Sequence, residues 1–508
     1  MSQAPARPIH FVHQGQVQQV SGLPPTTTVL QWLREHAHCT GTKEGCAEGD
    51  CGACTVVVAE ADASGALQRR TVNACIQFLP TLDGKALFTV EDLPALNGGA
   101  LHPCQQALVD CHGSQCGFCT PGFVMSLWHS YEQHPHALPR SDLADALSGN
   151  LCRCTGYRPI LDAGAQMYEA PRVALDPLPV LALLKQLADT DAPLVYEGPD
   201  PAAPGQTARF HAPRTLDELA SLRQQLPQAR LLAGSTDVGL WVTKQFKPLG
   251  DIVYLGRVSA LQAITPWGGS SGAPEGIEIG AGATLEAAWS ALSQHVPALK
   301  EIWLRFASPP VRHAGTMGGN VANGSPIGDS APILLALGAA VVLRQGSVTR
   351  EMPLSAFYLD YMKNALAPGE FLQAIRVPLP KVAQGEVFRA YKISKRRDSD
   401  ISALCAGLMI QLDGDTITAA RLGWGGMAGT ARRAAATEAA LIGQAWNEAT
   451  LRQAQAALAQ DFQPLSDLRA TQGYRLKVAA NLLERFWLET RPQSPLPASQ
   501  VHVWPATA

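Results

Sequence analysis

Eight of the twelve cysteines form two groups of four, each gathered within a short stretch of the chain. The first group is spaced C-x4-C-x2-C-x20-C and consists of Cys46, Cys51, Cys54 and Cys75. The second group is spaced C-x2-C-x32-C-x-C and consists of Cys116, Cys119, Cys152 and Cys154. Cysteines grouped in this way bind metals as thiolates, so the spacing predicts two metal centres near the amino-terminal end of the chain.

The first group has the spacing that holds a [2Fe–2S] cluster in proteins of the plant ferredoxin type. Gly45, Gly49 and Gly52 are interleaved with its first three cysteines, and glycines let backbone N–H groups approach the cluster sulfurs. A tetrahedral zinc site more commonly uses paired C-x2-C elements, so this spacing favours iron–sulfur. The C-x2-C and C-x-C pairs of the second group leave zinc open as an alternative.

Composition argues against a disulfide scaffold, a nucleic-acid-binding protein and a membrane-spanning protein. Hydrophobic residues make up 46% of the 508 residues and charged residues 16%, which is typical of globular domains. The net charge is −3, so no nucleic-acid partner is expected. No run of about 18 apolar residues and no secretory signal is apparent, which favours metal-binding cysteines in a reducing cytoplasm. The remaining cysteines are expected to be ordinary buried or half-buried thiols: Cys39, Cys104, Cys111 and Cys405.

Local patterns divide the cysteine-containing part into two domains. Residues 8–20 are predicted to form a hairpin that turns at Gln14-Gly15, followed by a helix that Thr26–Thr28 can cap. With the strand Thr55–Val58, this predicts a small β-grasp domain over 7–92. A helical domain is predicted over 93–170, with these helix-start signals: Pro103, Thr120-Pro121 as N-cap and N1, Ser141 as a cap, and Pro159. Cys119 then precedes a helix whose positive end favours an anionic cluster.

Proline- and glycine-rich breaks divide the remainder. Residues 171–207 are predicted to be a linker with at most one helix, over Val180–Leu187. An α+β domain is predicted over 208–384, with Thr215 and Glu218 forming a capping box. A second α+β domain is predicted over 385–492, and 493–508 is predicted to be a loose tail.

Two glycine-containing segments have the composition of pyrophosphate-binding loops, although glycine turns are commonly only turns. The first runs through Leu231, Leu232, Ala233, Gly234, Ser235, Thr236, Asp237 and Val238. The second runs through Thr316, Met317, Gly318, Gly319 and Asn320 towards Asp329. A third segment, Gly423–Ala428, fits G-x-G-x-x-A, but no clear βαβ unit follows it, so a structural turn is predicted there.

The flanks of the second cysteine group, GSQCGFCTPG and GNLCRCTGYRPI, resemble the helical [2Fe–2S] domain of the molybdenum hydroxylases, the family of xanthine dehydrogenase and aldehyde oxidase. The resemblance includes EGCAEGDCGAC in the first cysteine loop and both glycine-containing segments, so it covers nearly the whole chain. It implies a multidomain α+β protein. Its domains would be a β-grasp [2Fe–2S] ferredoxin domain, a four-helix [2Fe–2S] domain, a two-part α+β FAD-binding domain of the vanillyl-alcohol-oxidase/PCMH-like type and a C-terminal α+β flavoprotein domain.

The resemblance also implies roles for single residues. Both glycine-containing segments are expected to bind FAD, together with Phe306, Asp329, Leu372 and Lys392. Gln115 is expected to contact the pterin of a molybdenum cofactor held elsewhere, since an amide both donates and accepts; a plain helix-end glutamine is the alternative. Tyr361 and Asp398 are expected near NAD, although the charge run 392–400 can also be a solvated strand end. No catalytic residue is assigned to this chain.

The order of iron–sulfur, iron–sulfur and FAD domains resembles the small subunit of bacterial xanthine dehydrogenases. Because the sequence stops at Ala508, the hydroxylating centre is expected on a large molybdopterin-binding partner, with the pair doubled into a heterotetramer. The resemblance implies that electrons from hypoxanthine or xanthine oxidation to urate pass through the second-group cluster, the first-group cluster and FAD to NAD. The alternatives are a subunit of an aldehyde, carbon monoxide or hydroxybenzoyl-CoA enzyme, a free-standing iron–sulfur flavoprotein and a zinc-stabilised interaction module.

Overall fold

The computed structural model describes residues 5–188, 192–269 and 274–501. The chain divides into two compact units, and each is described by itself. Unit 1 comprises Met1–Ala260, Thr284–Glu286 and Ala307–Thr316; unit 2 comprises Leu261–Ala283, Ala287–Phe306 and Met317–Ala508. None of the helices in the described ranges is long and apolar enough to cross a lipid bilayer.

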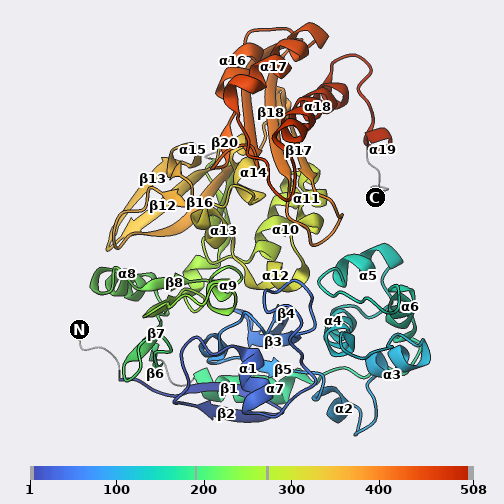
Figure 1. The fold of residues 1–508 in the computed structure, drawn as a ribbon, viewed down its shortest axis with the longest axis vertical. Coiled ribbons are helices and arrows are strands. Elements are labelled where there is room, and N and C mark those ends of the chain that lie inside the picture. Colours follow the sequence, from blue (N-terminus) through green and yellow to red (C-terminus); the bar gives the residue numbers. More distant parts are fainter. Residues whose placement is uncertain (1–4, 189–191, 270–273, 502–508) are drawn as a thin grey trace. The chain divides into compact units, whose positions relative to one another are not determined.

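Unit 1 begins with a five-stranded sheet in the order β2-β1-β5-β3-β4 (Figure 1). Its strands are β1 (Ile9–His13), β2 (Gln16–Val20), β3 (Thr55–Ala61), β4 (Leu67–Asn73) and β5 (Ala86–Phe88). The predicted hairpin is confirmed: Gln14 and Gly15 have φ of 50° and 67°, as a two-residue turn with the right twist requires. Helix α1 (Val29–Glu35) starts behind Thr28, which forms a capping box with Gln31.

Both faces of this sheet are covered. Val56 and Val58 of β3 belong to one core with residues of α1, including Trp32. Val57 and Ala59 alternate with them and belong to a second core, which includes residues of the helical domain. Burial on both faces explains why β3 is a nearly continuous apolar run.

The helical domain follows with a short helix and the four predicted ones. They are α2 (Leu93–Leu96), α3 (Pro103–Asp110), α4 (Thr120–Gln133), α5 (Arg140–Ala146) and α6 (Arg158–Gln166). Two predicted caps are wrong. Thr120 is the first residue of α4, whose N-cap is Cys119; its hydroxyl donates to Ser114 Oγ (2.7 Å), and no side chain caps the helix. The extended backbone of Pro139, not the Ser141 side chain, begins α5.

The segment expected to be a linker contains more structure than the sequence indicated. The predicted helix is present as α7 (Pro177–Ala188), but strand β6 (Leu194–Pro199) also lies within 171–207. Leu194, Val195 and Tyr196 are all buried, a short apolar strand that the flanking Pro, Gly and Asp residues obscured. Tyr196 OH donates to the carbonyl of Leu23 at 2.6 Å, which fastens β6 beside the amino-terminal domain.

Strand β6 belongs to a four-stranded sheet of unit 1 in the order β6-β7-β9-β8. The other elements of this part are β7 (Thr207–Ala212), α8 (Leu216–Gln225), β8 (Arg230–Leu232), α9 (Val238–Thr243), β9 (Ile252–Tyr254) and α12 (Pro309–Ala314). The predicted capping box of Thr215 with Glu218 is present at α8. The first glycine-containing segment starts on β8 and ends in α9.

Unit 2 contains an antiparallel sheet in the order β10-β11-β16-β12-β13 (Figure 1). Its strands are β10 (Ile264–Trp267), β11 (Gly276–Gly280), β12 (Ala340–Gln345), β13 (Val348–Pro353) and β16 (Phe371–Pro378). A two-stranded ribbon consists of β14 (Tyr358–Asp360) and β15 (Lys363–Asn364). The helices of this part are α10 (Leu285–His295, from Ala287 in unit 2), α11 (Lys300–Arg305), α13 (Met317–Asn323), α14 (Ser330–Leu337) and α15 (Leu354–Phe357).

The carboxy-terminal part of unit 2 is an antiparallel meander with helices on it. It consists of β17 (Glu386–Ile393), β18 (Leu404–Asp413), β19 (Thr416–Gly425), β20 (Arg432–Arg433), α16 (Ala435–Leu441), α17 (Glu448–Asp461) and α18 (Gln472–Thr490). Gly423 lies in β19, where a Cβ atom would come within 2.0 Å of the Pro332 carbonyl oxygen. The predicted turn is wrong for the first half of the G-x-G-x-x-A segment, because residues 423–425 end β19. The next helix starts only at Ala435, so the segment does not open a helix.

The predicted loose tail, 493–508, is not wholly irregular. Leu496 N donates to the carbonyl of Leu488 at 2.8 Å, and the short helix α19 (Ala498–Val501) follows. Residues 502–508 lie outside the described part of the chain.

Candidate iron–sulfur and flavin sites

The four cysteines of the first group lie together on the loop between α1 and β3 and just after β4. The Cys46 thiol contacts those of Cys51 and Cys75, and the Cys75 thiol also contacts that of Cys54. Cys54 and Cys75 are buried, whereas Cys46 and Cys51 are half-buried. Among the described residues, no group of three or more His, Cys, Asp or Glu side chains is placed to hold one metal ion. The four thiols form a continuous run of contacts from Cys51 through Cys46 and Cys75 to Cys54. Four cysteine side chains gathered in this way suit a two-iron cluster with four thiolate ligands.

The protonation of these thiols is mutually dependent. Contact with Cys51 lowers the pKa of Cys46 well below its usual range. Contact with Cys46 raises the pKa of Cys51 and of Cys75 well above theirs. Four thiolates repel one another at this distance, so they can coexist only around cationic charge, which iron would supply.

Backbone donors and glycines complete the first loop. Cys51 N donates to Cys46 Sγ at 3.4 Å, the kind of N–H to sulfur bond that tunes a cluster. A Cβ atom on Gly45 would lie 2.9 Å from Cys51 Sγ, and Gly49 has φ of +77°. The loop therefore requires glycine at these positions, and its residues fit the predicted [2Fe–2S] cluster.

The second group lies at the ends of the helices of the helical domain. Cys116 contacts Cys154, and Cys119 contacts Cys152. The Phe118 backbone N–H and the Cys154 thiol lower the pKa of Cys116. Burial, followed by the contact with Cys152, raises the pKa of Cys119 to about 12. As in the first group, four thiols lie in mutual contact, which fits a second cluster.

The second group is the more exposed one. Cys116 and Cys154 are exposed, and so are the neighbouring Gln115 and Phe118. Beside them lies an apolar hollow of about 490 Å³. Its lining includes Leu101, Leu108, Val109, Thr120, Pro121 and Val124. An exposed cluster loop beside an apolar hollow can receive another protein surface.

The other cysteines are structural, as predicted. Cys39, Cys104 and Cys405 are buried and Cys111 is half-buried. Burial raises the pKa of Cys39, so this thiol stays protonated and unreactive near neutral pH.

In unit 1, the first glycine-containing segment is packed against the end of α12. A Cβ atom on Gly234 would lie 1.8 Å from the Ala314 carbonyl oxygen. Ser235 has φ of 64°, and its hydroxyl donates to the carbonyl of Ile76 at 2.6 Å. The Ser235 hydroxyl is thus engaged within the protein, which favours backbone N–H groups over this hydroxyl as donors for a pyrophosphate.

In unit 2, the second glycine-containing segment is a helix and not the expected loop. Met317–Asn323 form α13. A Cβ atom on Gly318 would lie 2.5 Å from the Ala281 Cα atom, so glycine here permits close packing of α13 on the end of β11. Phe306 and Leu372, the two apolar candidates, are 7% and 5% exposed, and the Phe306 ring packs 5.8 Å from that of Trp289.

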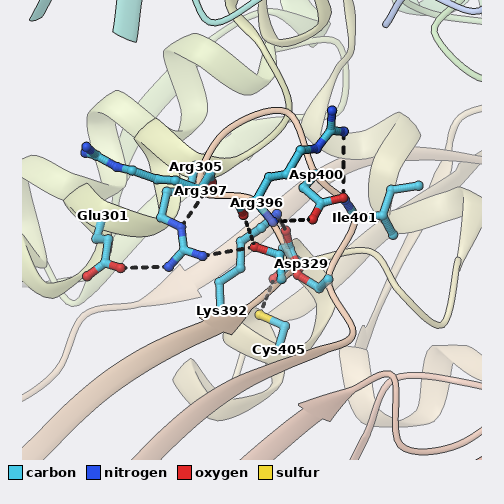
Figure 2. A network of polar contacts seen from close by, with 11 residues as sticks. Glu301, Arg305, Asp329, Lys392, Arg396, Arg397, Asp400, Ile401 and Cys405 are labelled. Carbon is cyan, nitrogen blue, oxygen red and sulfur yellow. Dashed lines mark hydrogen bonds and ion pairs between the residues drawn. The ribbon is translucent and has the colours of Figure 1, made fainter. Parts of the chain in front are cut away.

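Two further flavin candidates of unit 2 form a buried ion pair (Figure 2). Lys392 Nζ of β17 lies 2.6 Å from Oδ2 of Asp329, the N-cap of α14. The Ser402 hydroxyl donates to the other carboxylate oxygen at 2.6 Å, and Cys405 Sγ donates to the Asp329 carbonyl at 3.8 Å. The family resemblance assigned Asp329 and Lys392 to one site, whereas nothing in the sequence pointed to Ser402.

Figure 2 also shows Arg305, which the sequence did not single out. Its guanidinium donates to Glu301 Oε1 (2.8 Å), Ser394 Oγ (3.0 Å) and the Arg397 carbonyl (3.3 Å). This side chain braces the loop after β17, which carries Asp398. The other NAD candidate, Tyr361, lies between β14 and β15 and is 64% exposed.

Four family models match consecutive parts of the chain. The first two describe a 2Fe-2S iron–sulfur cluster binding domain (residues 11–79) and a [2Fe-2S] binding domain (89–165). The others describe the FAD binding domain in molybdopterin dehydrogenase (206–380) and the CO dehydrogenase flavoprotein C-terminal domain (389–490).

Two curated relatives align with more than nine tenths of the chain. The chain is 32% identical to a xanthine dehydrogenase of Emericella nidulans, covering 96% of this chain and 39% of the relative. It is 30% identical to aldehyde oxidase 4 of Cavia porcellus, covering 92% of this chain and 38% of the relative. The chain thus spans less than two fifths of these curated relatives.

A solved structure of reconstituted CO dehydrogenase from Oligotropha carboxidovorans aligns with a TM-score of 0.50 and 28% identity, covering 56% of this chain and 96% of that one. The matched domains, in this order, define an iron–sulfur flavoprotein. The chain belongs to the molybdenum hydroxylase family and contains its two [2Fe–2S] domains and its FAD-binding domain.

Proposed function

We propose that this chain is the electron-transfer component of a xanthine dehydrogenase. It would carry electrons from a molybdopterin centre on a partner subunit through two [2Fe–2S] clusters to FAD, which reduces NAD. The observation that supports this most strongly is the 32% identity to xanthine dehydrogenases over as much as 96% of the chain, which includes both cysteine groups and the flavin region. The clusters would transfer single electrons, and the flavin would convert them to hydride transfer.

The chain's own residues would hold and insulate these groups. The first cluster would be held by Cys46, Cys51, Cys54 and Cys75 and the second by Cys116, Cys119, Cys152 and Cys154. FAD would be bound by residues 231–238 and 316–320 together with Phe306, Asp329, Leu372 and Lys392. Tyr361 and Asp398 would lie near NAD.

The exposure of the two cysteine groups supports a direction for the electrons. Cys116 and Cys154 are exposed, whereas Cys54 and Cys75 are buried. The second group, with Gln115 and the apolar hollow beside it, would therefore face the large molybdopterin-binding subunit and receive electrons first. The amide of Gln115 would contact the pterin. The assembly would be a heterotetramer in the cytoplasm.

The decisive assay is xanthine-dependent reduction of NAD by the chain coexpressed with a molybdopterin-binding partner. Xanthine should reduce the clusters and flavin under anaerobic conditions, and NAD should reoxidise them. Stable isolation as an iron–sulfur flavoprotein that no molybdopterin partner accompanies would overturn the proposal.

A second candidate is the equivalent component of an aldehyde- or carbon-monoxide-oxidising enzyme. It is favoured by the 30% identity to an aldehyde oxidase and the likeness to CO dehydrogenase structures. The same reduction assay separates the candidates, because the substrate that bleaches the flavin identifies the class. Reduction by an aldehyde or by carbon monoxide and not by xanthine would replace the first proposal with this one.

A further inference from the structure

One buried side chain, Asn150, connects the two cysteine groups of unit 1. It lies two residues before Cys152 and is 3% exposed. Its Nδ2 donates to the Gly52 carbonyl at 3.1 Å and to Thr55 Oγ1 at 3.2 Å. Its Oδ1 accepts from Ser126 Oγ at 2.6 Å. Both ends of the carboxamide are therefore used, so its orientation is fixed.

A backbone hydrogen bond lies directly beside this side chain. Leu151 N donates to the carbonyl of Cys51 at 3.0 Å. Cys51 belongs to the first cysteine group, and Leu151 is bonded to Cys152 of the second. The route from one ligand to the other thus runs along backbone and crosses a single hydrogen bond.

Around the Asn150 side chain, the two loops approach each other closely enough for their backbones to meet. A Cβ atom on Gly52, whose φ is +69°, would lie 2.1 Å from the Gly149 carbonyl oxygen. A Cβ atom on Gly122, in the first turn of α4, would lie 2.1 Å from the Gly52 carbonyl oxygen. The Gly52 carbonyl also accepts from Thr55 N at 3.0 Å and Thr55 Oγ1 at 2.8 Å, so it is held from both domains.

We propose that Asn150 is a positioning residue that sets the distance between the two clusters, and with it the rate at which electrons pass between them. The inference rests on the proposed function, because it requires a cluster in each group. Electron tunnelling falls steeply with distance and is favoured along bonded paths. Asn150 holds the Gly52 carbonyl, one residue from Cys51, and thereby keeps the Cys51 to Leu151 bond short. Without the amide, the loops lose this anchor and can separate.

The test uses the chain loaded with both clusters and FAD, and reduced with dithionite. In this reduced chain, magnetic interaction between the two clusters reports their separation in electron paramagnetic resonance. The transfer rate is measured separately on the oxidised chain, where a light-triggered electron pulse reduces one cluster and the other accepts the electron. Asn150→Ala should reduce the magnetic splitting and slow the transfer several-fold, while iron content and the potential of each cluster stay as in the wild type. Gln133→Ala is the matched control, since this α4 amide bonds to His129 and not to either cysteine loop.

A purely structural role predicts a different result. In that case Asn150→Ala lowers thermal stability but leaves splitting and transfer rate unchanged, which would overturn the inference. If Asn150→Ala fails to retain both clusters, Ser126→Ala decides, because it removes only the donor to Asn150 Oδ1. Weaker splitting in Ser126→Ala supports the inference, and wild-type splitting contradicts it.

The same measurements separate this inference from the proposed function. If the clusters of the loaded protein couple magnetically as expected, but xanthine cannot reduce them in the presence of the partner, only the proposed function is wrong. If the protein reduces NAD normally with xanthine, but Asn150→Ala leaves the magnetic splitting unchanged, only the inference about Asn150 is wrong.

Discussion

Lys392 Nζ lies 2.6 Å from Asp329 Oδ2, and the two side chains are 2% and 6% exposed. The pair joins β17 to the start of α14 within unit 2. Because Ser402 donates to the second carboxylate oxygen, the negative charge is satisfied on both oxygens. Buried pairs of this kind are costly to break from one side, since the remaining charge has no solvent to compensate it.

Replacing Lys392 alone should therefore damage both stability and flavin binding. Lys392→Met leaves Asp329 buried without its cation and should destabilise unit 2 by about 3–5 kcal/mol. Flavin absorbance per chain should fall, and the thermal unfolding temperature should fall with it. The double variant Asp329→Asn/Lys392→Met should recover stability, because no charge remains unpaired. Recovery of full flavin occupancy in the double variant would show that the pair has only a structural role.

Gly234 offers a steric test of the first flavin segment. A Cβ atom there would lie 1.8 Å from the Ala314 carbonyl oxygen, so Gly234→Ala must displace backbone. We expect most of the FAD to be lost, while iron content and the visible spectrum of the clusters persist. Gly473→Ala is the control, because nothing lies within 4 Å of that position. Normal flavin content in Gly234→Ala would remove residues 231–238 from the flavin site.

Gln115 tests the direction of electron flow. Gln115→Ala should slow xanthine-dependent reduction of the clusters by an order of magnitude or so, the scale of losing one hydrogen bond at about 1 kcal/mol or slightly more. Reduction by dithionite, reoxidation by NAD and iron content should be unchanged, because the side chain is exposed and holds no cluster. Slower reoxidation by NAD with normal reduction by xanthine would contradict the proposed order of the two clusters.

The helical domain should be sensitive to acid through His129. Burial is the main reason that the pKa of His129 is lowered to about 4, and the positive charges of Arg69 and His134 lower it as well. The bond to the Arg69 carbonyl and the negative charge of Glu286 act in the opposite direction. The unfolded chain binds this proton below about pH 6.5, whereas the folded chain binds it only near pH 4. The free energy of unfolding that neutral His129 contributes is therefore fully present above about pH 6.5 and is lost as the pH falls towards 4. His313, whose ring lies 5.4 Å away, has its pKa lowered in the same direction.

His129→Gln should accordingly flatten the fall in stability between pH 6.5 and 4, by about 1.4 kcal/mol for each unit of pKa shift removed. Thermal unfolding across this pH range measures it. An equally steep decline in the variant would show that other groups, His313 among them, carry the acid sensitivity.

Features determined by neighbouring residues could be read from the sequence. The turn at Gln14-Gly15, the cap expected within Thr26–Thr28 and the capping box at Thr215 depend on residues at most three apart, and each is present. The cysteine spacings were informative for the same reason, because loop geometry brings Cys46 and Cys51 together.

Features made by distant residues could not be derived in this way. Strand β6 exists because Leu194–Pro199 pairs with β7 and packs on the amino-terminal domain, while its own flanks resemble a linker. The bond from Asn150 to Gly52 spans 98 residues, and that from Ser402 to Asp329 spans 73. Only a resemblance to known proteins indicated that Asp329 and Lys392 belong to the flavin site, and no local sequence pattern predicts that they form an ion pair.

The central claim is that two distinct [2Fe–2S] clusters and one FAD share this chain. The most direct measurement combines metal and flavin analysis with electron paramagnetic resonance of the reduced protein. We predict about four irons per flavin and two distinct signals of equal intensity, of which Cys51→Ser removes one, Cys119→Ser removes the other and Cys111→Ser removes neither. Zinc in place of iron, or a single signal that either ligand substitution abolishes, would contradict the account.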